Sequence, residues 1–249
     1  MVQLIYFSSL KIKQIMKKIF LGITLFFTIT TTIFGQSMYL EGGFGMQFTK
    51  PDGLNFVVDR YNETRPFLTE EMEHFNNLDG FNYGFLAIVD HLAFEAIYTH
   101  RSQTRSAVGI DATNQEVERR LRAVMNGLGL GLGYGLTEDG FSIIFSTRLN
   151  TSALRIRTKV GSTDEIGSQD WDEDIYNSLI FDLDFNIKII LKYITIEPYY
   201  TFDILPSLNN MAEVNETINP NTFQNDSNEL PFQGRGFGLK FLFLLGGEF

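Results

Sequence analysis

The C-terminal stretch of this chain, residues 234–249, alternates large apolar side chains with smaller or less apolar ones. One face of the pattern carries Phe237, Leu239, Phe241, Phe243, Leu245 and Phe249, and the other carries Gly236, Gly238, Lys240, Leu242 and Leu244. A period of two residues predicts a β-strand. A soluble domain would leave so apolar a terminal strand exposed to water, whereas a chain that closes a barrel inside a lipid bilayer can end on it.

Seven earlier stretches show the same alternation, so eight antiparallel strands are expected. The seven are Tyr39–Phe48, Phe81–Val89, Leu92–Arg101, Val124–Leu136, Phe141–Asn150, Leu179–Ile189 and Ile194–Asp203. Their connections are short near Asp90, Thr137–Gly140 and Lys192, and long at Lys50–Leu78, Ser102–Glu116, Thr158–Asp172 and Ile204–Gln233. Strict alternation of short and long connections is typical of outer-membrane barrels, which have short periplasmic turns and long extracellular loops.

The N-terminal residues predict a cleaved secretory signal peptide. Lys17 and Lys18 precede the apolar run Ile19–Phe34, and small or polar residues follow it. The run is too short and too rich in threonine for a spanning helix. We therefore expect residues 1–36 to be an upstream extension plus leader with the true start at Met16, and residues 37–249 to form one barrel domain.

The less apolar face of the strands carries charges of both signs. These residues are Glu41, Glu95, Arg148, Asp182, Asp184, Lys188, Glu197 and Lys240. A soluble β-sandwich or lipocalin-like barrel would also alternate in this way, with the charges in water. The leader, the loop alternation and the terminal aromatic residue favour the membrane barrel instead. Because the lumen of an eight-stranded barrel is filled by side chains, and unpaired buried charges are costly, we expect the charges to pair across it.

Local features add four expectations. The glycines at alternate positions from 127 to 135 make room in the lumen for long neighbours such as Arg148. Pro198 lies within a strand, where its missing N–H marks a bulge or a rim. Residues Leu54–Tyr61 could add a hairpin and raise the count to ten strands. Trp171 fits an anchor at the membrane interface.

The last strand and its Phe249 resemble the closing strand of bacterial outer-membrane β-barrels, whose final aromatic residue is read by the assembly machinery. The general plan resembles the small OmpA/OmpX/OmpW-like barrels, by pattern and not by a diagnostic motif. This resemblance implies an integral protein of the Gram-negative outer membrane, without cofactors and monomeric. Its partners are then outer-membrane lipid, lipopolysaccharide and the barrel-assembly machinery.

Composition narrows the remaining possibilities. The formal charge of −10 disfavours a nucleic-acid partner, and the absence of cysteine excludes disulfides and thiolate metal sites. The predicted loops are acidic, but no spacing matches an EF-hand, so no metal site is expected. Their acidic residues are Asp52, Asp59, Glu63, Glu70, Glu71 and Glu73 in the first, Asp164, Glu165, Asp170 and Asp172 in the third, and Glu213, Glu216, Asp226 and Glu229 in the fourth.

We expect a structural or surface-interaction role through these acidic extracellular loops, without catalysis. One alternative is a small pore for ions or small solutes. A second alternative is a lipid A-modifying hydrolase, because His100 and Ser102 resemble the His-x-Ser arrangement of outer-membrane lipid A deacylases. In that alternative Glu116 supplies the acid of a hydrolytic triad.

Overall fold

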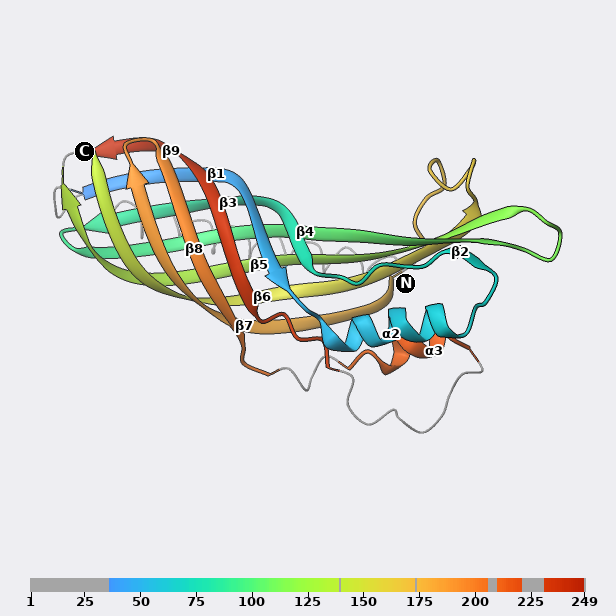
Figure 1. Cartoon of the computed structure of the whole chain (residues 1–249). Helices are drawn as coiled ribbons and strands as arrows, with labels where there is room; N and C mark the ends of the chain where they lie inside the picture. Colours follow the sequence, from blue (N-terminus) through green and yellow to red (C-terminus); the bar gives the residue numbers. More distant parts are fainter. Residues whose placement is uncertain (1–35, 139, 173, 206–209, 221–230, 249) are drawn as a thin grey trace, which may run out of the picture.

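The computed structural model describes residues 36–138, 140–172, 174–205, 210–220 and 231–248. Eight antiparallel strands pair in the order β1, β3, β4, β5, β6, β7, β8, β9, and β9 pairs with β1 to close a ring (Figure 1). Their bounds are β1 Gln36–Thr49, β3 Asn77–Val89, β4 Leu92–Ile110, β5 Glu116–Glu138, β6 Phe141–Ser162, β7 Asp174–Leu191, β8 Ile194–Asp203 and β9 Gly236–Glu248. The predicted eight-stranded up-and-down barrel is confirmed.

The outer face of the ring is covered by apolar side chains on every strand. On β5, for example, Leu128, Leu130 and Leu132 expose 62, 71 and 64% of their surface. We call these exposed apolar side chains the lipid-facing belt, because they can contact the acyl chains of a bilayer. Closure of the ring leaves no strand edge with unpaired backbone groups inside the bilayer. The chain is therefore a transmembrane β-barrel of the outer-membrane type.

The turns at one end of the barrel are as short as the sequence predicts. Two residues separate β3 from β4, β5 from β6, and β7 from β8. Asp90, Gly140 and Lys192 have φ values of 54, 78 and 57°, the left-handed conformation that tight hairpins require. We refer to this as the turn end of the barrel.

Four strands are much longer than predicted. The expected loop Ser102–Glu116 is mostly strand, because β4 runs to Ile110 and β5 starts at Glu116, and β6 continues into the expected third loop as far as Ser162. Past the barrel, β4 to β7 continue as an open sheet (Figure 1). The sequence-based bounds stopped where the outward-facing residues cease to be apolar, although the alternation itself continues.

Helices α2 (Asp52–Glu63) and α3 (Ala212–Ile218) lie under one face of this open sheet, and the short strand β2 (Leu68–Glu70) pairs with β4 (Figure 1). The two helices, β2 and the outer ends of β4 to β7 (103–110, 116–123, 156–162 and 174–178) together form what we call the outer cap. The ten-strand alternative is wrong, since Leu54–Tyr61 is helical. Among the described residues, no helix is both long and apolar enough to cross a membrane.

The outer cap has a hydrophobic core of its own. Leu54, Val57 and Val58 of α2 are fully buried, as is Val214 of α3. They pack against side chains of the sheet face that continues the barrel interior, including Ala107, Leu121, Ala123, Leu154, Ile156 and Tyr176. The described parts of the first, second and fourth long connections therefore contribute to a folded structure.

Pro198 does not cause a bulge. The ladder between β7 and β8 is interrupted beside it, but the pairs Asn186↔Tyr199 and Ile189↔Ile196 on either side keep the same register. On its other side Pro198 still pairs with Leu239. Because proline has no N–H, the hydrogen-bond ladder is interrupted locally, but the register of the strand does not change.

Two sequence-based expectations lie outside the described residues. These are the leader, of which only Gln36 is described, and the terminal Phe249. The domain boundary near residue 36 and the assembly signal therefore stay predictions.

Candidate functional site

The barrel lumen holds all eight charged residues that the alternation places on the inner face. None of them exposes more than 6% of its surface. They come from six strands: Glu41 from β1, Glu95 from β4, Arg148 from β6, Asp182, Asp184 and Lys188 from β7, Glu197 from β8, and Lys240 from β9. The period of two in every strand is what directs them inward.

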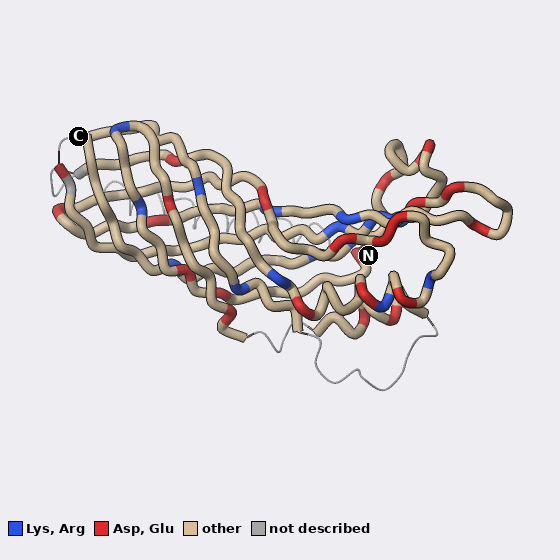
Figure 2. Tube along the Cα trace, in the orientation of Figure 1, with Lys and Arg blue, Asp and Glu red and all other residues tan. Residues whose placement is uncertain are grey.

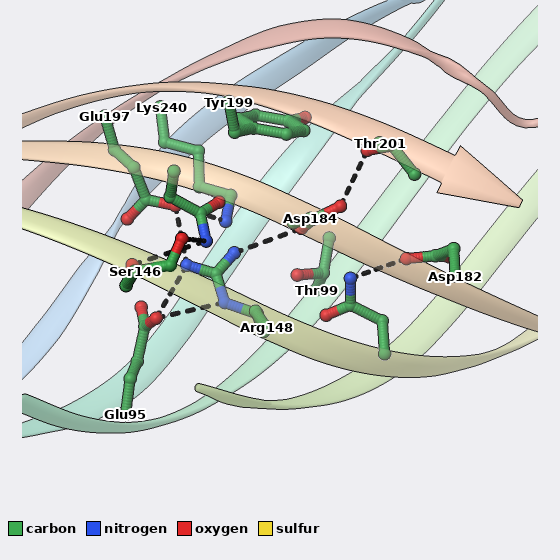
Figure 3. Close-up of polar contacts among 12 residues, drawn as sticks. Glu95, Thr99, Ser146, Arg148, Asp182, Asp184, Glu197, Tyr199, Thr201 and Lys240 are labelled. Atoms are coloured by element: carbon green, nitrogen blue, oxygen red, sulfur yellow. Dashed lines mark hydrogen bonds and ion pairs between the residues drawn. The ribbon is translucent and has the colours of Figure 1, made fainter. Parts of the chain in front are cut away.

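Arg148 lies at the centre of the charged layer (Figure 3). Its Nη2 atom is 2.7 Å from Glu95 Oε2 and 2.6 Å from Glu197 Oε1. Its Nη1 atom is 3.3 Å from Asp184 Oδ2, and Asp184 also accepts a hydrogen bond from Thr201 at 2.7 Å. One guanidinium thus bridges carboxylates from three other strands across the lumen. Charge-assisted bonds of this kind are the strong ones, and here they replace lost hydration.

Two lysines extend the layer toward the β1–β9 seam. Lys188 Nζ lies 2.8 Å from both Glu41 Oε2 and Glu95 Oε1, and 3.3 Å from Glu197 Oε2. Lys240 Nζ lies 2.8 Å from Glu197 Oε1. Four carboxylates and three cations are therefore linked into one group, which we call the lumen network.

Asp182 differs from the other seven predicted lumen residues. It is buried, but it accepts a hydrogen bond from Asn150 at 2.5 Å and joins no ion pair within the described ranges. The structure therefore brings seven of the eight residues into contact and leaves Asp182 beside the group.

Sequence reasoning missed two residues of the lumen. Tyr199 is 2% exposed, its ring lies 4.8 Å from Lys240 Nζ and 5.3 Å from the Arg101 guanidinium carbon, and its hydroxyl donates to the Met46 carbonyl. Arg101 donates to Gln47. Both residues have inward parity, which was the available signal.

The glycine row on β5 makes room for the lumen network. A Cβ atom on Gly129 would lie 2.5 Å from Arg148 Cδ, and one on Gly131 would lie 3.1 Å from Glu95 Oε2. Since Cβ atoms in real structures do not approach other heavy atoms closer than about 3.0 Å, a side chain at 129 would displace the arginine. These glycines hold the space that Arg148 fills, as the sequence predicts.

Side chains fill the lumen at three successive levels. An apolar cluster lies toward the turn end and consists of Leu86, Ile88, Ala93, Ile144, Ile190 and Leu244. The lumen network lies above it, and the core of the outer cap lies above the network. Each level presents a different obstacle to a solute, first apolar, then charged, then apolar again.

The hydrolase alternative is not supported by the geometry. The His100 ring is hydrogen-bonded to Asn126 Oδ1 at 2.6 Å, and Ser102 Oγ accepts from Arg122 at 3.4 Å. Glu116 pairs with Ile110, eight residues along β4 from Ser102, which places it about 27 Å away along the strand. Histidine, serine and acid are therefore not assembled as a triad.

A cleft opens on the helix side of the outer cap, far from the barrel. Its volume is about 610 Å³, and its walls include Phe67, Leu68, Ile110, Val117 and Val160. Two cations lie in it beside one aromatic ring: the guanidinium carbons of Arg65 and Arg119 are 3.9 and 5.6 Å from the centre of the Tyr61 ring. Burial lowers the pKa of Arg65, and the nearby charge of Arg119 lowers it further. We call this the cap cleft.

The acidic residues of the first long connection are largely paired or exposed. Asp59 lies 2.6 Å from the His74 ring, and Glu73 lies 2.9 Å from Arg105. Within the part of the chain that the structure describes, no group of three or more potential ligands is arranged for a metal ion.

Comparison with known proteins gives structural similarity only. No family model and no curated protein matches the sequence. Among solved structures, the chain is similar to the crystal structure of Ail, the attachment invasion locus protein of Yersinia pestis, at 9% identity and a TM-score of 0.40, over 87% of this chain and 100% of that chain. Ail in complex with the heparin analogue sucrose octasulfate matches with the same coverage, at 8% identity and a TM-score of 0.33. The barrel described above rests on the strand pairing of this chain itself.

Proposed function

We propose that this protein is a closed outer-membrane anchor whose outer cap binds a ligand at the cell surface. The barrel supplies position and stability, and the cap supplies recognition. The leader and Phe249 support export and assembly, with residues 37–249 as the mature domain and no cofactor required. The turn end then faces the periplasm and the cap faces the medium. We expect the protein to work as a monomer, because its ring is complete without a second copy.

A single observation carries this proposal: the chain blocks its lumen and folds its longest connections into a cap with a core. Arg148, fully buried and bound to three carboxylates, lies in the middle of the only route through the described barrel. A layer of paired charges across the lumen would block a pore. A protein that served only as a membrane anchor would not require a folded outer cap. The pore alternative is therefore not proposed.

The cap cleft is the surface that best fits binding. Phe67, Ile110 and Val160 line it and expose 53, 44 and 43% of their surface, although they lie beyond the lipid-facing belt. Arg119 has a tyrosine ring and the Thr158 hydroxyl as its neighbours there. An apolar cleft with cations beside an aromatic ring fits an amphipathic anion, in which an apolar group is joined to a carboxylate or sulfonate.

Closure is tested by recording currents across planar bilayers that contain the purified protein. We expect no steady single-channel conductance, since the lumen network and the two apolar levels exclude water. A reproducible conductance at low voltage would contradict the closed-barrel part of the proposal.

Binding is tested with the fluorescent anion 8-anilinonaphthalene-1-sulfonate, which has the chemistry of the proposed ligand. Protein in lipid nanodiscs should bind it saturably above the lipid background, and Arg119→Ser should weaken this binding about tenfold. Arg60→Ser removes an arginine from α2 that does not line the cleft, and this variant should bind like the parent. Equal binding by all three proteins would overturn the assignment of the cleft.

A further inference from the structure

Four arginines lie together on the face of β5 and β6 that continues the lipid-facing surface. Arg120 and Arg122 have the parity of the exposed Leu128 and Leu130, so they point away from the helices. Arg155 and Arg157 do the same on β6. Figure 2 shows basic residues gathered where the sheet leaves the barrel. We call these four residues the arginine ladder.

The ladder places like charges directly opposite one another. Arg122 pairs with Arg157 across the two strands, and Arg120 pairs with Lys159. Directly opposed like charges destabilise a sheet, and here they gather in a chain whose formal charge is −10. A local excess of positive charge at this cost indicates that an anion belongs there.

The neighbouring carboxylates do not balance the ladder. Glu118 accepts from Arg120 at 2.7 Å, and Asp174 lies 2.5 Å from Arg157 and 3.7 Å from Arg155. Four guanidinium groups and two carboxylates leave an excess of two positive charges. Arg122 forms no ion pair with a carboxylate of the described residues, and its contacts are the Ser102 hydroxyl and the Trp171 ring. The Nε atom of Arg155 is buried and makes no hydrogen bond to the described residues.

The height of the ladder above the apolar belt identifies the anion. Exposed Leu179 is paired with Ala153, and Arg155 is the next outward position on β6. At about 3.3 Å per residue, Arg155 lies about 7 Å along the strand beyond the belt, and the Arg122–Arg157 pair lies about 7 Å further. With a strand tilt of about 40°, Arg155 and the Arg122–Arg157 pair lie about 5–10 Å above the belt, at the outer edge of the headgroup layer of a membrane, and Arg120 lies about 15 Å above the belt.

We propose that the arginine ladder binds phosphate groups of the outer-leaflet lipid that surrounds the barrel, of the kind carried by lipid A. Guanidinium groups match phosphate oxygens in bidentate geometry. Trp171 lies on the same side of the sheet, 5.6 Å from Arg122 and 4.9 Å from Lys159, where an indole ring suits the interface. This inference rests on the outer-membrane placement proposed above, with the cap outside.

The test uses the full-length protein in phosphatidylcholine nanodiscs that contain a small fraction of lipid A. Bis-phosphorylated lipid A should raise the unfolding temperature by several degrees, and dephosphorylated lipid A should not. The double variant Arg122→Gln/Arg157→Gln should need about tenfold more lipid A for the same shift. The control Lys50→Gln/Arg60→Gln removes two positive charges from the helix side and should respond like the parent.

Three outcomes overturn the inference. They are an equal response of parent and ladder variant, an equal response to the two forms of lipid A, and a full response to inorganic phosphate alone, which would indicate a soluble anion as the ligand. Heat-modifiable migration on gels shows whether each variant is folded, and Arg122→Lys/Arg157→Lys keeps the charge and should restore part of the effect. Conductance and cleft binding are measured without lipid A, so they succeed or fail independently of this result.

Discussion

The ring of Tyr199 occupies the space beside Gly238 in which any side chain at that position would have to lie. The two residues are direct neighbours across the β8–β9 ladder. Because Gly238 has no side chain, the Tyr199 ring can pack directly against the backbone of β9 on the inner face of the barrel. In that position the ring lies 4.8 Å from Lys240 Nζ, at the edge of the lumen network.

Replacing Gly238 with alanine should therefore destabilise the barrel. The added methyl group collides with the Tyr199 ring and forces it toward Lys240, which should cost about 1–3 kcal/mol in unfolding free energy. Urea titration in lipid vesicles measures the difference. Gly247→Ala, on the same strand with open space around it, should change stability by less than about 0.5 kcal/mol. Equal losses for the two variants would contradict the packing argument.

Replacing Arg148 with methionine should cost far more than replacing an exposed arginine. The change leaves Glu95, Asp184 and Glu197 without their shared partner, and breaking a buried ion pair on one side costs about 3–5 kcal/mol. Arg60→Met breaks an exposed pair with Glu63 and should cost at most about 1 kcal/mol. Unfolding free energies of the two variants are compared under identical conditions, and similar values would show that the network contributes little.

Removing two cations from the lumen should by itself leave the barrel closed. In Arg148→Ala/Lys188→Ala two of the three cations of the lumen network are gone, but the apolar levels on either side of the network remain. We expect no steady current in planar bilayers, as for the parent protein, and a cation-selective conductance would show that the lumen network alone closes the barrel. Gly247→Ala, near the turn end and with open space around it, serves as the control and should also show no current.

His100→Ala should leave lipid A unchanged in cells that produce this protein. His100 is bound to Asn126 and not to Ser102, so it lacks the arrangement that activates a serine. Mass spectrometry of extracted lipid A compares acyl chains from cells with the parent, the variant and neither protein. Loss of an acyl chain that depends on His100 would revive the hydrolase alternative.

The outer cap should lose stability in acid through Glu118. Two hydrogen bonds from Arg120 hold the pKa of Glu118 below its usual value of 4.5. Because the pKa of Glu118 is lower in the folded protein than in the unfolded chain, its carboxylate stabilises the fold at any pH above the pKa of the unfolded chain. This contribution to the free energy of unfolding disappears as the pH falls through the pKa of the folded protein. Fluorescence of Trp171, the only tryptophan, follows cap unfolding above and below about pH 4.5. Glu118→Gln should flatten the decline, and an unchanged decline would exclude this pair as its source.

Alternation in the sequence is enough to predict the barrel, because each strand in a membrane has two different surroundings, lipid and lumen. It also predicts which charges point inward. It does not predict their partners: Lys188 and Glu41 are 147 residues apart, and only the stagger between strands brings them to one level. The contact is a property of ring closure and not of either strand alone.

The outer cap was predicted poorly for two different reasons. Beyond the lipid-facing belt, the outward positions of β5 and β6 carry arginines such as Arg120 and Arg157. The strands still alternate there, but their outward positions are no longer apolar. For α2 the signal was present: Leu54, Val57, Val58 and Tyr61 have the spacing of an amphipathic helix. The hairpin predicted at Leu54–Tyr61 follows the two-residue period of the neighbouring strands, whereas these residues repeat with the helical period.

The two cap helices flank the seam at which the ring closes. Helix α2 follows β1 and helix α3 precedes β9, and β1 and β9 are the first and last strands of the ring. Arg65, just after α2, donates to the Ile218 carbonyl of α3 and to Asn219, and Thr49 donates to the Arg235 carbonyl. The Thr49 contact joins the ends of β1 and β9 directly, and the Arg65 contacts join the connections that lead from β1 and into β9. The outer cap therefore holds together the two strands at which the ring closes, and its contacts add to the β1–β9 ladder itself.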